Sequence, residues 1–225
     1  MNLKKEAAAK AITLIREKTI VGLGAGSTIA YLVEFLRQEL ENGLEVKFVT
    51  SSFSTNELLL KNKFTVLQIA SLSKIDIYFD GCDQLDKELN ALKSGGGIHT
   101  QEKLLASMAD QFVLIGDETK LVDNFDNSFP VVIELLPQAA AFVPAKILNL
   151  FPGASSSFRI SDKKDGYVIT ENANYLLDLW FQTWPDLATI NPVLKTVTGV
   201  VETSLFYKMA HTAIIAGKAG VKVLE

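Results

Sequence analysis

The sequence predicts an α/β fold, in which a mostly parallel sheet carries helices on both faces and a smaller α+β unit follows. Three observations support this prediction. Short apolar strands alternate with amphipathic helices up to about residue 127, prolines and a Gly/Ser patch then interrupt the alternation, and strand-like apolar segments return at the end. Because this tail can rejoin the first sheet, we expect the smaller unit to be an insertion. The expected domains are residues 1–127 with 206–225, and residues 128–205.

The first unit is expected to begin with an amphipathic helix, because Ala8, Ala11, Ile12 and Ile15 recur at helical spacing. The patterns that follow predict strands at 20–23, 45–49, 65–69, 75–79 and 112–115, and helices at 29–40, 52–60 and 101–109. The second unit is predicted to contain strands at 131–135, 157–160, 167–170, 175–180 and 199–204, with helices near 139–150 and 185–194. The tail segments 213–216 and 221–224 have strand character.

Composition restricts the classes of function. The chain has 225 residues, of which 48% are hydrophobic, and a net charge of -4. Affinity for nucleic acids comes from clustered Lys and Arg, so this acidic chain is not expected to bind them. The single Cys82 cannot form an internal disulfide, and no Cys/His cluster of the zinc-binding kind is present. Because we find neither a secretory signal nor an apolar run long enough to span a bilayer, we expect a cytoplasmic protein without a membrane partner.

The first candidate site is the loop GLGAGST at 22–28, between a predicted strand and a predicted helix. Backbone N–H groups and the helix dipole can hold a phosphate at such a place. Ser27 stands where a dinucleotide fingerprint would have its third glycine, and the lysine of a P-loop is absent. The loop therefore indicates either a cradle for a small phosphate or a tight turn without a ligand.

Charged residues follow other predicted strands at the same edge. Asp80 and Asp83 come directly after the strand at 75–79, and such a pair can hold a metal, act as acid and base, or cap a turn. Lys93 begins a glycine loop that leads to Glu102 in the first turn of a helix, and Lys120 follows the strand at 112–115. Four loops that converge on one edge favour a site for an anionic ligand over four unrelated turns.

In order and spacing, these motifs resemble those of the type A ribose-5-phosphate isomerase family. The family has G-x-G-T-G-S-T, T-S-S, D-G-A-D-E, K-G-G-G-G before an EK helix start, and D-x-S-K. This chain has GLGAGST at 22–28, TSS at 50–52, DGCDQ at 80–84, KSGGG at 93–97, EK at 102–103 and DETK at 117–120. The likeness continues into GVVETSLF at 199–206 and AGVKVLE at 219–225. The departures from the family pattern are Ala25, Cys82, Gln84, Ser94 and Ala173.

The resemblance implies interconversion of D-ribose 5-phosphate and D-ribulose 5-phosphate in the non-oxidative pentose phosphate pathway. We expect a Rossmann-like sheet with an inserted ferredoxin-like domain, whose exposed apolar faces favour a homodimer or homotetramer. Carried over residue by residue, the family pattern gives Glu102 as the catalytic base, with Asp80, Asp83 and Lys93 as further catalytic residues. It gives the substrate contacts as Ala25, Gly26, Ser27, Thr28, Asp80, Gly81, Cys82, Asp83, Lys93, Ser94, Gly95, Gly96 and Lys120.

The implied reaction agrees with these residue types. Moving a proton between C2 and C1 through an enediolate needs a base beside both carbons and a positive group beside the oxyanion, roles that suit Glu102 and Lys93. Asp80 and Asp83 are expected to handle hydroxyl protons, including those of ring opening. The phosphate is expected to contact Ser27, Thr28, and Lys120 or Lys5. No metal or other cofactor is expected, since a hydride shift on a metal would require more ligand-type side chains.

Other functions of the same fold family stay open on the sequence. This fold family includes sugar-phosphate deaminases, CoA transferases and the sensor domains of transcriptional regulators. A regulator should carry a helix-turn-helix segment with a basic face, and a CoA transferase a longer chain with its own glutamate motif; we find neither. The main alternative is a divergent sugar-phosphate-binding paralogue or sensor with weak or altered isomerase activity, because the phosphate loop has lost a hydroxyl at Ala25.

Overall fold

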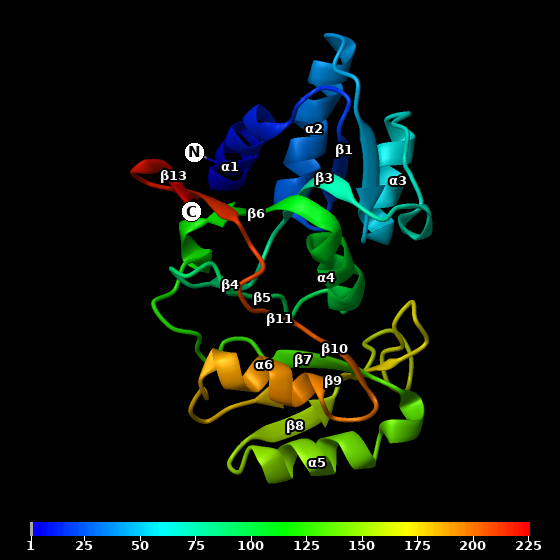
Figure 1. Cartoon of the computed structure of the whole chain (residues 1–225), viewed down its shortest axis with the longest axis vertical. Coiled ribbons are helices and arrows are strands. Elements are labelled where there is room, and N and C mark those ends of the chain that lie inside the picture. Colours follow the sequence, from blue (N-terminus) through cyan, green and yellow to red (C-terminus); the bar gives the residue numbers. More distant parts are fainter. Residues whose placement is uncertain (1) are drawn as a thin grey trace.

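The computed structural model of the protein describes residues 2–225 and places two main sheets at opposite ends of its long axis (Figure 1). The larger sheet has six strands in the order β13-β12-β6-β3-β1-β2. All of its neighbours pair in parallel except β12 and β13. The strands are β1 (Ile20–Leu23), β2 (Lys47–Thr50), β3 (Ile75–Asp80), β6 (Ala109–Asp117), β12 (Thr212–Gly217) and β13 (Gly220–Leu224).

Helices cover both faces of this sheet, which confirms the predicted fold class. On one face, α1 (Leu3–Ala11), α2 (Ser27–Glu41) and α3 (Phe53–Lys61) contribute buried residues to a core that includes Val21 and Phe79. On the other face, α4 (His99–Met108) packs through Leu105 and Ala106 against Tyr78. The tail strand β12 pairs with β6, so the end of the chain returns to the first sheet as expected.

The smaller sheet is antiparallel and has the strand order β10-β7-β9-β8. Its elements follow one another as β7 (Val131–Leu135), α5 (Phe142–Leu150), β8 (Ser155–Phe158), β9 (Tyr175–Trp180), α6 (Leu187–Lys195) and β10 (Val200–Thr203). This order is the ferredoxin-like arrangement that the sequence led us to expect. Both helices pack on the same face, because Val143 of α5 and Ile190 of α6 lie in one core with Ile133 and Leu179.

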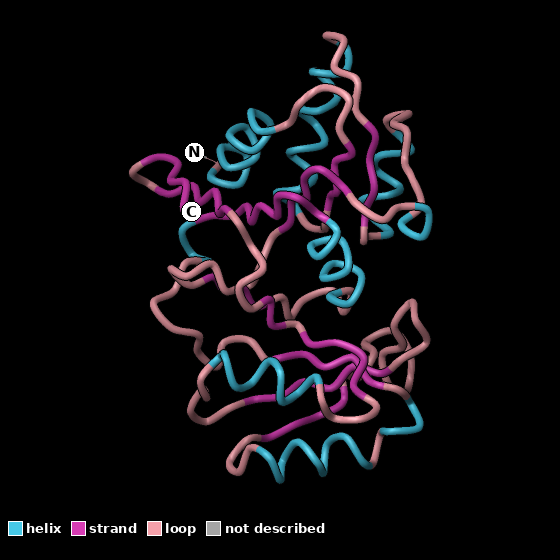
Figure 2. Tube along the Cα trace, viewed as in Figure 1, coloured by secondary structure: helices cyan, strands magenta, loops and turns pink. Residues whose placement is uncertain are grey.

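A third sheet lies between the other two and was not predicted. It consists of β4 (Gln84–Leu85), β5 (Ala91–Leu92) and β11 (Leu205–Phe206), and the connections on either side can be followed in Figure 2. Strands of two residues have no period that a sequence pattern could reveal. The chain leaves the smaller sheet at Thr203 and enters β11 at Leu205. The domain limits 1–127 with 206–225, and 128–205, stay a prediction.

Two of the predicted strands are wrong. Residues 65–69 form a single bridge, from Val66 to Phe48 of β2, because the chain then turns into the 3-10 helix Ile69–Ser71. Residues 167–170 make only isolated bridges. That segment bends back at Ala173, whose φ is 61°, and Thr170 N–H donates to the Asn174 carbonyl at 2.9 Å. Among residues 2–225 no helix is both long and apolar enough to cross a membrane.

Gly24 marks a close approach between two strand ends. A Cβ atom there would lie 2.0 Å from Cγ of Asp80. Asp80 cannot move aside easily, because it is buried and its carboxylate accepts hydrogen bonds from Ala25 N, Tyr78 Oη and Gly81 N. Only glycine therefore fits at this position without displacing a hydrogen-bonded carboxylate.

We expect Gly24→Ala to lower the free energy of unfolding by at least about 1–3 kcal/mol, the usual cost of overpacking. Urea unfolding measures the change. Gly81→Ala is the matched control, because a Cβ there would lie 3.8 Å from the nearest atom, the carbonyl oxygen of Ile115. A Gly24→Ala variant as stable as the wild type would contradict this description of the strand ends.

Candidate active site

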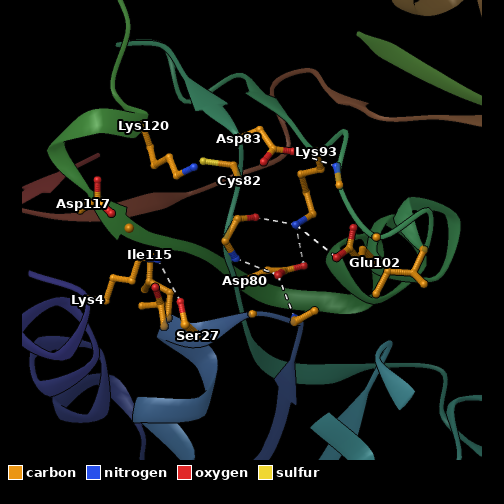
Figure 3. A pocket seen from close by; sticks show the side chains of 18 residues that line it. Lys4, Ser27, Asp80, Cys82, Asp83, Lys93, Glu102, Ile115, Asp117 and Lys120 are labelled. Atoms are coloured by element: carbon orange, nitrogen blue, oxygen red, sulfur yellow. Dashed lines mark hydrogen bonds and ion pairs between the residues drawn. The ribbon is translucent and has the colours of Figure 1, made fainter. Parts of the chain in front are cut away.

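A pocket of about 360 Å³ opens where the carboxyl ends of β1, β3 and β6 meet the first turns of α2 and α4. Ligands of open parallel sheets bind at such an edge. Figure 3 shows its acidic and lysine side chains around a common space. The lining residues are Lys4, Ala25, Gly26, Ser27, Thr28, Asp80, Gly81, Cys82, Asp83, Lys93, Gly95, Gly96, Ile98, Glu102, Ile115, Gly116, Asp117 and Lys120.

One end of the pocket suits an anion. The helix α2 begins at Ser27, and no side chain caps its N-terminus. Its N-cap residue, Gly26, has a φ of 97°, a conformation that glycine adopts without strain. The first N–H groups of α2 and the positive end of its dipole are thus available to an anionic group.

Two lysines lie at this end of the pocket. Lys4 Nζ of α1 donates to Ser27 Oγ at 3.0 Å, and Lys120 ends the turn Glu118–Lys120 after β6. Lys5, which the sequence offered as an alternative phosphate contact, does not line the pocket and instead pairs with Glu34 at 3.6 Å. The structure therefore favours Lys4, rather than Lys5, as the lysine that would contact an anion together with Lys120.

The Asp80 carboxylate, at the end of β3, is held from several sides. Its Oδ1 accepts from the N–H groups of Ala25 and Gly81 at 3.3 and 2.8 Å, and its Oδ2 accepts from Tyr78 Oη at 2.6 Å. Lys93 Nζ lies 3.0 Å from the same Oδ2. These four donors stabilise the negative charge and leave the side chain, which is 1% exposed, little freedom to move.

Lys93 links the two buried carboxyl groups. Its Nζ lies 3.3 Å from Glu102 Oε1, in addition to its contact with Asp80, and it also donates to the Gly81 carbonyl. Burial alone would lower the pKa of Lys93, but the charges of Asp80 and Glu102 outweigh it and raise this pKa above its ordinary value. The ammonium therefore stays charged and presents a fixed positive charge to the pocket.

Glu102 is the carboxyl group with the weakest support. It is buried in the first turn of α4, and no described residue forms a hydrogen bond with its Oε2. Burial, and then the charge of Asp80, raise the pKa of Glu102 to about 8, against the lowering effect of Lys93. The carboxyl groups of Asp80 and Glu102 share the single ammonium of Lys93, so one of them takes up a proton. That group is Glu102, because its Oε2 accepts no hydrogen bond from a described residue. Such a group can accept and release a proton near neutral pH.

Asp83 supports the glycine loop and still has an open oxygen. Its Oδ2 accepts from the N–H groups of Ser94 and Gly95 at 2.7 and 2.9 Å. Within residues 2–225, no hydrogen bond is donated to its Oδ1. Asp83 can therefore exchange hydrogen bonds with a ligand without releasing the loop.

The residues that the sequence assigned to the site line this pocket, apart from Ser94 and the alternative phosphate contact Lys5. The Ser94 hydroxyl instead donates to the Pro130 carbonyl at 2.5 Å, so this side chain supports the loop from behind. The lining residues that sequence reasoning missed are Lys4, Ile98, Ile115, Gly116 and Asp117. The position of 115–117 at the end of a parallel strand was a usable signal, whereas Lys4 reaches the site only through the packing of α1. The role of each residue stays a prediction.

Two departures from the family pattern have a clear structural setting. Gln84 is buried, and its Nε2 donates to Asp126 Oδ1 at 2.5 Å, where a glutamate would meet a like charge. Cys82 lines the pocket, and burial raises the pKa of its thiol to about 12, so the thiol stays neutral. Among the described residues, neither side chain forms a hydrogen bond or an ion pair with Asp80, Lys93 or Glu102.

Comparison with known proteins gives a consistent result. Residues 47–220 match the family described as ribose 5-phosphate isomerase A (phosphoriboisomerase A). Ribose-5-phosphate isomerase A of Methanothermobacter thermautotrophicus is 39% identical over 226 residues, which cover 100% of this chain and 98% of that protein. The structure of ribose 5-phosphate isomerase A from Methanocaldococcus jannaschii is similar with a TM-score of 0.92 at 31% identity, covering 99% of this chain and 98% of that one. A D-ribose-5-phosphate isomerase in complex with phospho-erythronic acid has a TM-score of 0.93 at 34% identity, over 100% of both chains.

We expect the Glu102 carboxyl to titrate near pH 8, because burial and Asp80 disfavour its ionised form. Carbon-13 NMR of glutamate-labelled protein measures this pKa, and Glu102→Gln identifies the resonance. Lys93→Met removes the ammonium 3.3 Å away, so the pKa of Glu102 should rise further in that variant. A resonance that titrates near the ordinary value of 4.5 would refute this electrostatic description.

Proposed function

The chain belongs to the ribose 5-phosphate isomerase A family, and we propose that it interconverts D-ribose 5-phosphate and D-ribulose 5-phosphate by proton transfer between C2 and C1. The observation that carries this proposal is the buried Glu102 carboxyl, which has a raised pKa and lies 3.3 Å from the Lys93 ammonium. A base that binds a proton near neutral pH and a fixed positive charge are the two groups that an enediolate reaction requires.

The pocket suits a phosphorylated five-carbon sugar. Its volume of about 360 Å³ lies in the usual range for small-molecule sites. Figure 3 shows Lys4, Ser27 and Lys120 on one side and Lys93 and Glu102 on the other. A phosphate held on the first side would place C1 and C2 beside the second, so that its binding energy serves the reaction. A relative's complex with phospho-erythronic acid supports a phosphorylated sugar acid as a probe for this site.

In the proposed reaction, the ionised Glu102 carboxylate removes the proton from C2 of the open-chain aldose. The C–H electrons form the carbon–carbon double bond of the enediolate, and O1 takes the negative charge, which the Lys93 ammonium stabilises. Glu102 then returns its proton to C1, while the hydroxyl proton of O2 moves to O1. The products are the ketose and the original carboxylate, so no redox partner is required.

Asp80 and Asp83 are proposed for different tasks. Asp80 has its carboxylate oxygens occupied by protein donors, so it anchors Lys93 and the loop at Ala25. Asp83 has one oxygen on the glycine loop and the other open, so it suits the transfer of hydroxyl protons, including those of ring opening. The proposal thus gives different tasks to two residues for which the sequence led us to expect the same role.

We also propose the setting that the sequence led us to expect: the non-oxidative pentose phosphate pathway, the cytoplasm, and a homodimer or homotetramer. The substrate pair supports the pathway, and the single free cysteine supports a reducing compartment. The exposed apolar side chains of Phe53, Phe142 and Ile160 support association between copies of the chain.

Glu102→Gln is expected to lower kcat on ribose 5-phosphate by about 10²–10⁴-fold, because the general base is lost. Binding of phospho-erythronic acid should change little, since the phosphate end is intact. Steady-state kinetics and titration calorimetry measure the two effects. Glu57→Gln, which exchanges an exposed glutamate of α3, is the control and should match the wild type. Near wild-type turnover in Glu102→Gln would exclude Glu102 as the base.

Isomerisation is expected to continue in excess EDTA, because Glu102 and Lys93 supply the base and the positive charge themselves. Within residues 2–225, no group of three or more His, Cys, Asp or Glu side chains is placed to hold a metal ion. Initial rates with EDTA, without it, and after addition of Mg²⁺ measure the dependence. Activity that is lost in EDTA and restored by Mg²⁺ would overturn the proton-transfer mechanism but not the isomerase assignment.

A further inference from the structure

The first turn of α4 is attached to the smaller sheet on both sides of Glu102. Before it, Thr100 Oγ1 donates to the Glu134 carboxylate of β7. After it, Lys103 Nζ donates to Glu202 Oε1 of β10 at 3.0 Å. No side chain caps this end of α4, and these two contacts join its first turn to the smaller sheet. Of residues 99–103, only Glu102 lines the active-site pocket.

Glu134 is a buried carboxylate without a salt-bridge partner among the described residues. Four side chains donate to it: Thr100, Thr170 at 2.8 Å, Asn172 at 3.0 Å and Asn174 at 2.8 Å. Burial alone would raise the pKa of Glu134, but these hydrogen bonds outweigh it and hold this pKa below its ordinary value. Burying a charge costs folding free energy, so packing alone does not account for a carboxylate at this position.

The strand β7 directs Glu134 toward α4. Val131, Ile133 and Leu135 lie in the core beneath α5 and α6. Because successive side chains of a strand point to opposite faces, Glu134 points to the face of the smaller sheet that meets α4. Gln101 Nε2 of α4 also donates to Asn172 Oδ1 at 3.1 Å, so the donors around Glu134 are themselves tied to the helix.

Building on the isomerase function proposed above, we infer that Glu134 is a positioning residue that fixes the first turn of α4 through the Thr100 hydroxyl and so holds the Glu102 carboxyl beside Lys93. Glu102 needs such support, because its Oε2 has no hydrogen-bond partner among residues 2–225 and its Oε1 contacts Lys93 at 3.3 Å. A displacement of about 1 Å at a reacting group can cost on the order of 10²-fold in rate. The smaller sheet therefore sets the catalytic geometry without lining the pocket.

Two threonines provide a matched test, because both donate a hydroxyl to Glu134 and only Thr100 belongs to α4. Thr100→Val and Thr170→Val should both lower the urea midpoint. Thr170→Val should lower it at least as much, since Thr170 Oγ1 also accepts from the N–H groups of Asn172 and Asn174. A purely structural role of Glu134 would then make Thr170→Val the more damaging variant.

Kinetics on ribose 5-phosphate separate the two roles. We expect Thr100→Val to lower kcat about 10- to 100-fold with little change in KM, because only the base is displaced. Thr170→Val should keep kcat within about twofold of the wild type. Thr100→Ser, which retains the hydroxyl, should restore most of the lost kcat. Should Thr100→Val not fold, Thr100→Ala removes the same hydroxyl without adding bulk.

The pKa of Glu102, measured by carbon-13 NMR, is a second readout that does not require the reaction. It should shift in Thr100→Val, where the distance to Lys93 changes, and stay unchanged in Thr170→Val. A wild-type protein without isomerase activity would overturn the proposed function, whereas this titration would still test the positioning role. Equal kcat values in the two threonine variants, together with an unshifted Glu102 pKa in both, would overturn the positioning role.

Discussion

The active site depends on one buried ammonium, Lys93 Nζ, which lies 3.0 Å from Asp80 and 3.3 Å from Glu102. Leaving one partner of a buried ion pair without its counter-charge typically costs about 3–5 kcal/mol, so the three side chains stabilise one another. One ammonium cannot neutralise two carboxylates, however. The excess negative charge is removed by a proton on the carboxyl group that accepts fewer hydrogen bonds. That group is Glu102, and the imbalance is the physical reason for its raised pKa. The same arrangement therefore stabilises the three side chains and raises the pKa of Glu102, the group that we propose as the base.

The three members of this cluster come from separate parts of the fold. Asp80 ends a strand of the larger sheet, Lys93 follows β5, and Glu102 lies on α4. The smaller sheet supports the two that do not come from the larger sheet. It holds the glycine loop through Arg159, whose Nη2 donates to the Ser94 carbonyl at 3.0 Å, and it holds α4 through Glu134. Gly97 lies close to the smaller sheet as well, because a Cβ atom at this position would lie 2.6 Å from Leu176 Cδ1 of β9. A unit that lies outside the pocket thus determines where two of its charged groups stand.

Much of this site could be predicted from the sequence, because its side chains occur in local patterns at strand ends and helix starts. Asp80 and Asp83 follow a buried strand, Lys93 precedes a glycine loop, and the topology of a parallel sheet brings these ends together. What the sequence did not reveal are contacts that only tertiary packing creates, such as those of Lys4 with Ser27 and of Thr100 with Glu134. Residues 167–170 were predicted as a strand, but the Thr170 hydroxyl binds the buried Glu134 carboxylate and the chain bends back toward Asn174. A hydrogen bond to a distant carboxylate leaves no trace in a local pattern.

Isotope transfer tests the central claim most directly. Ribulose 5-phosphate is converted by the wild-type protein in heavy water, and the ribose 5-phosphate formed is analysed by NMR and mass spectrometry. If the Glu102 carboxyl carries the proton, it exchanges with the solvent during the life of the enediolate, and deuterium enters C2 of the product. Ribose 5-phosphate that contains no deuterium at C2 would show that the transferred hydrogen does not exchange with the solvent, and it would contradict this account.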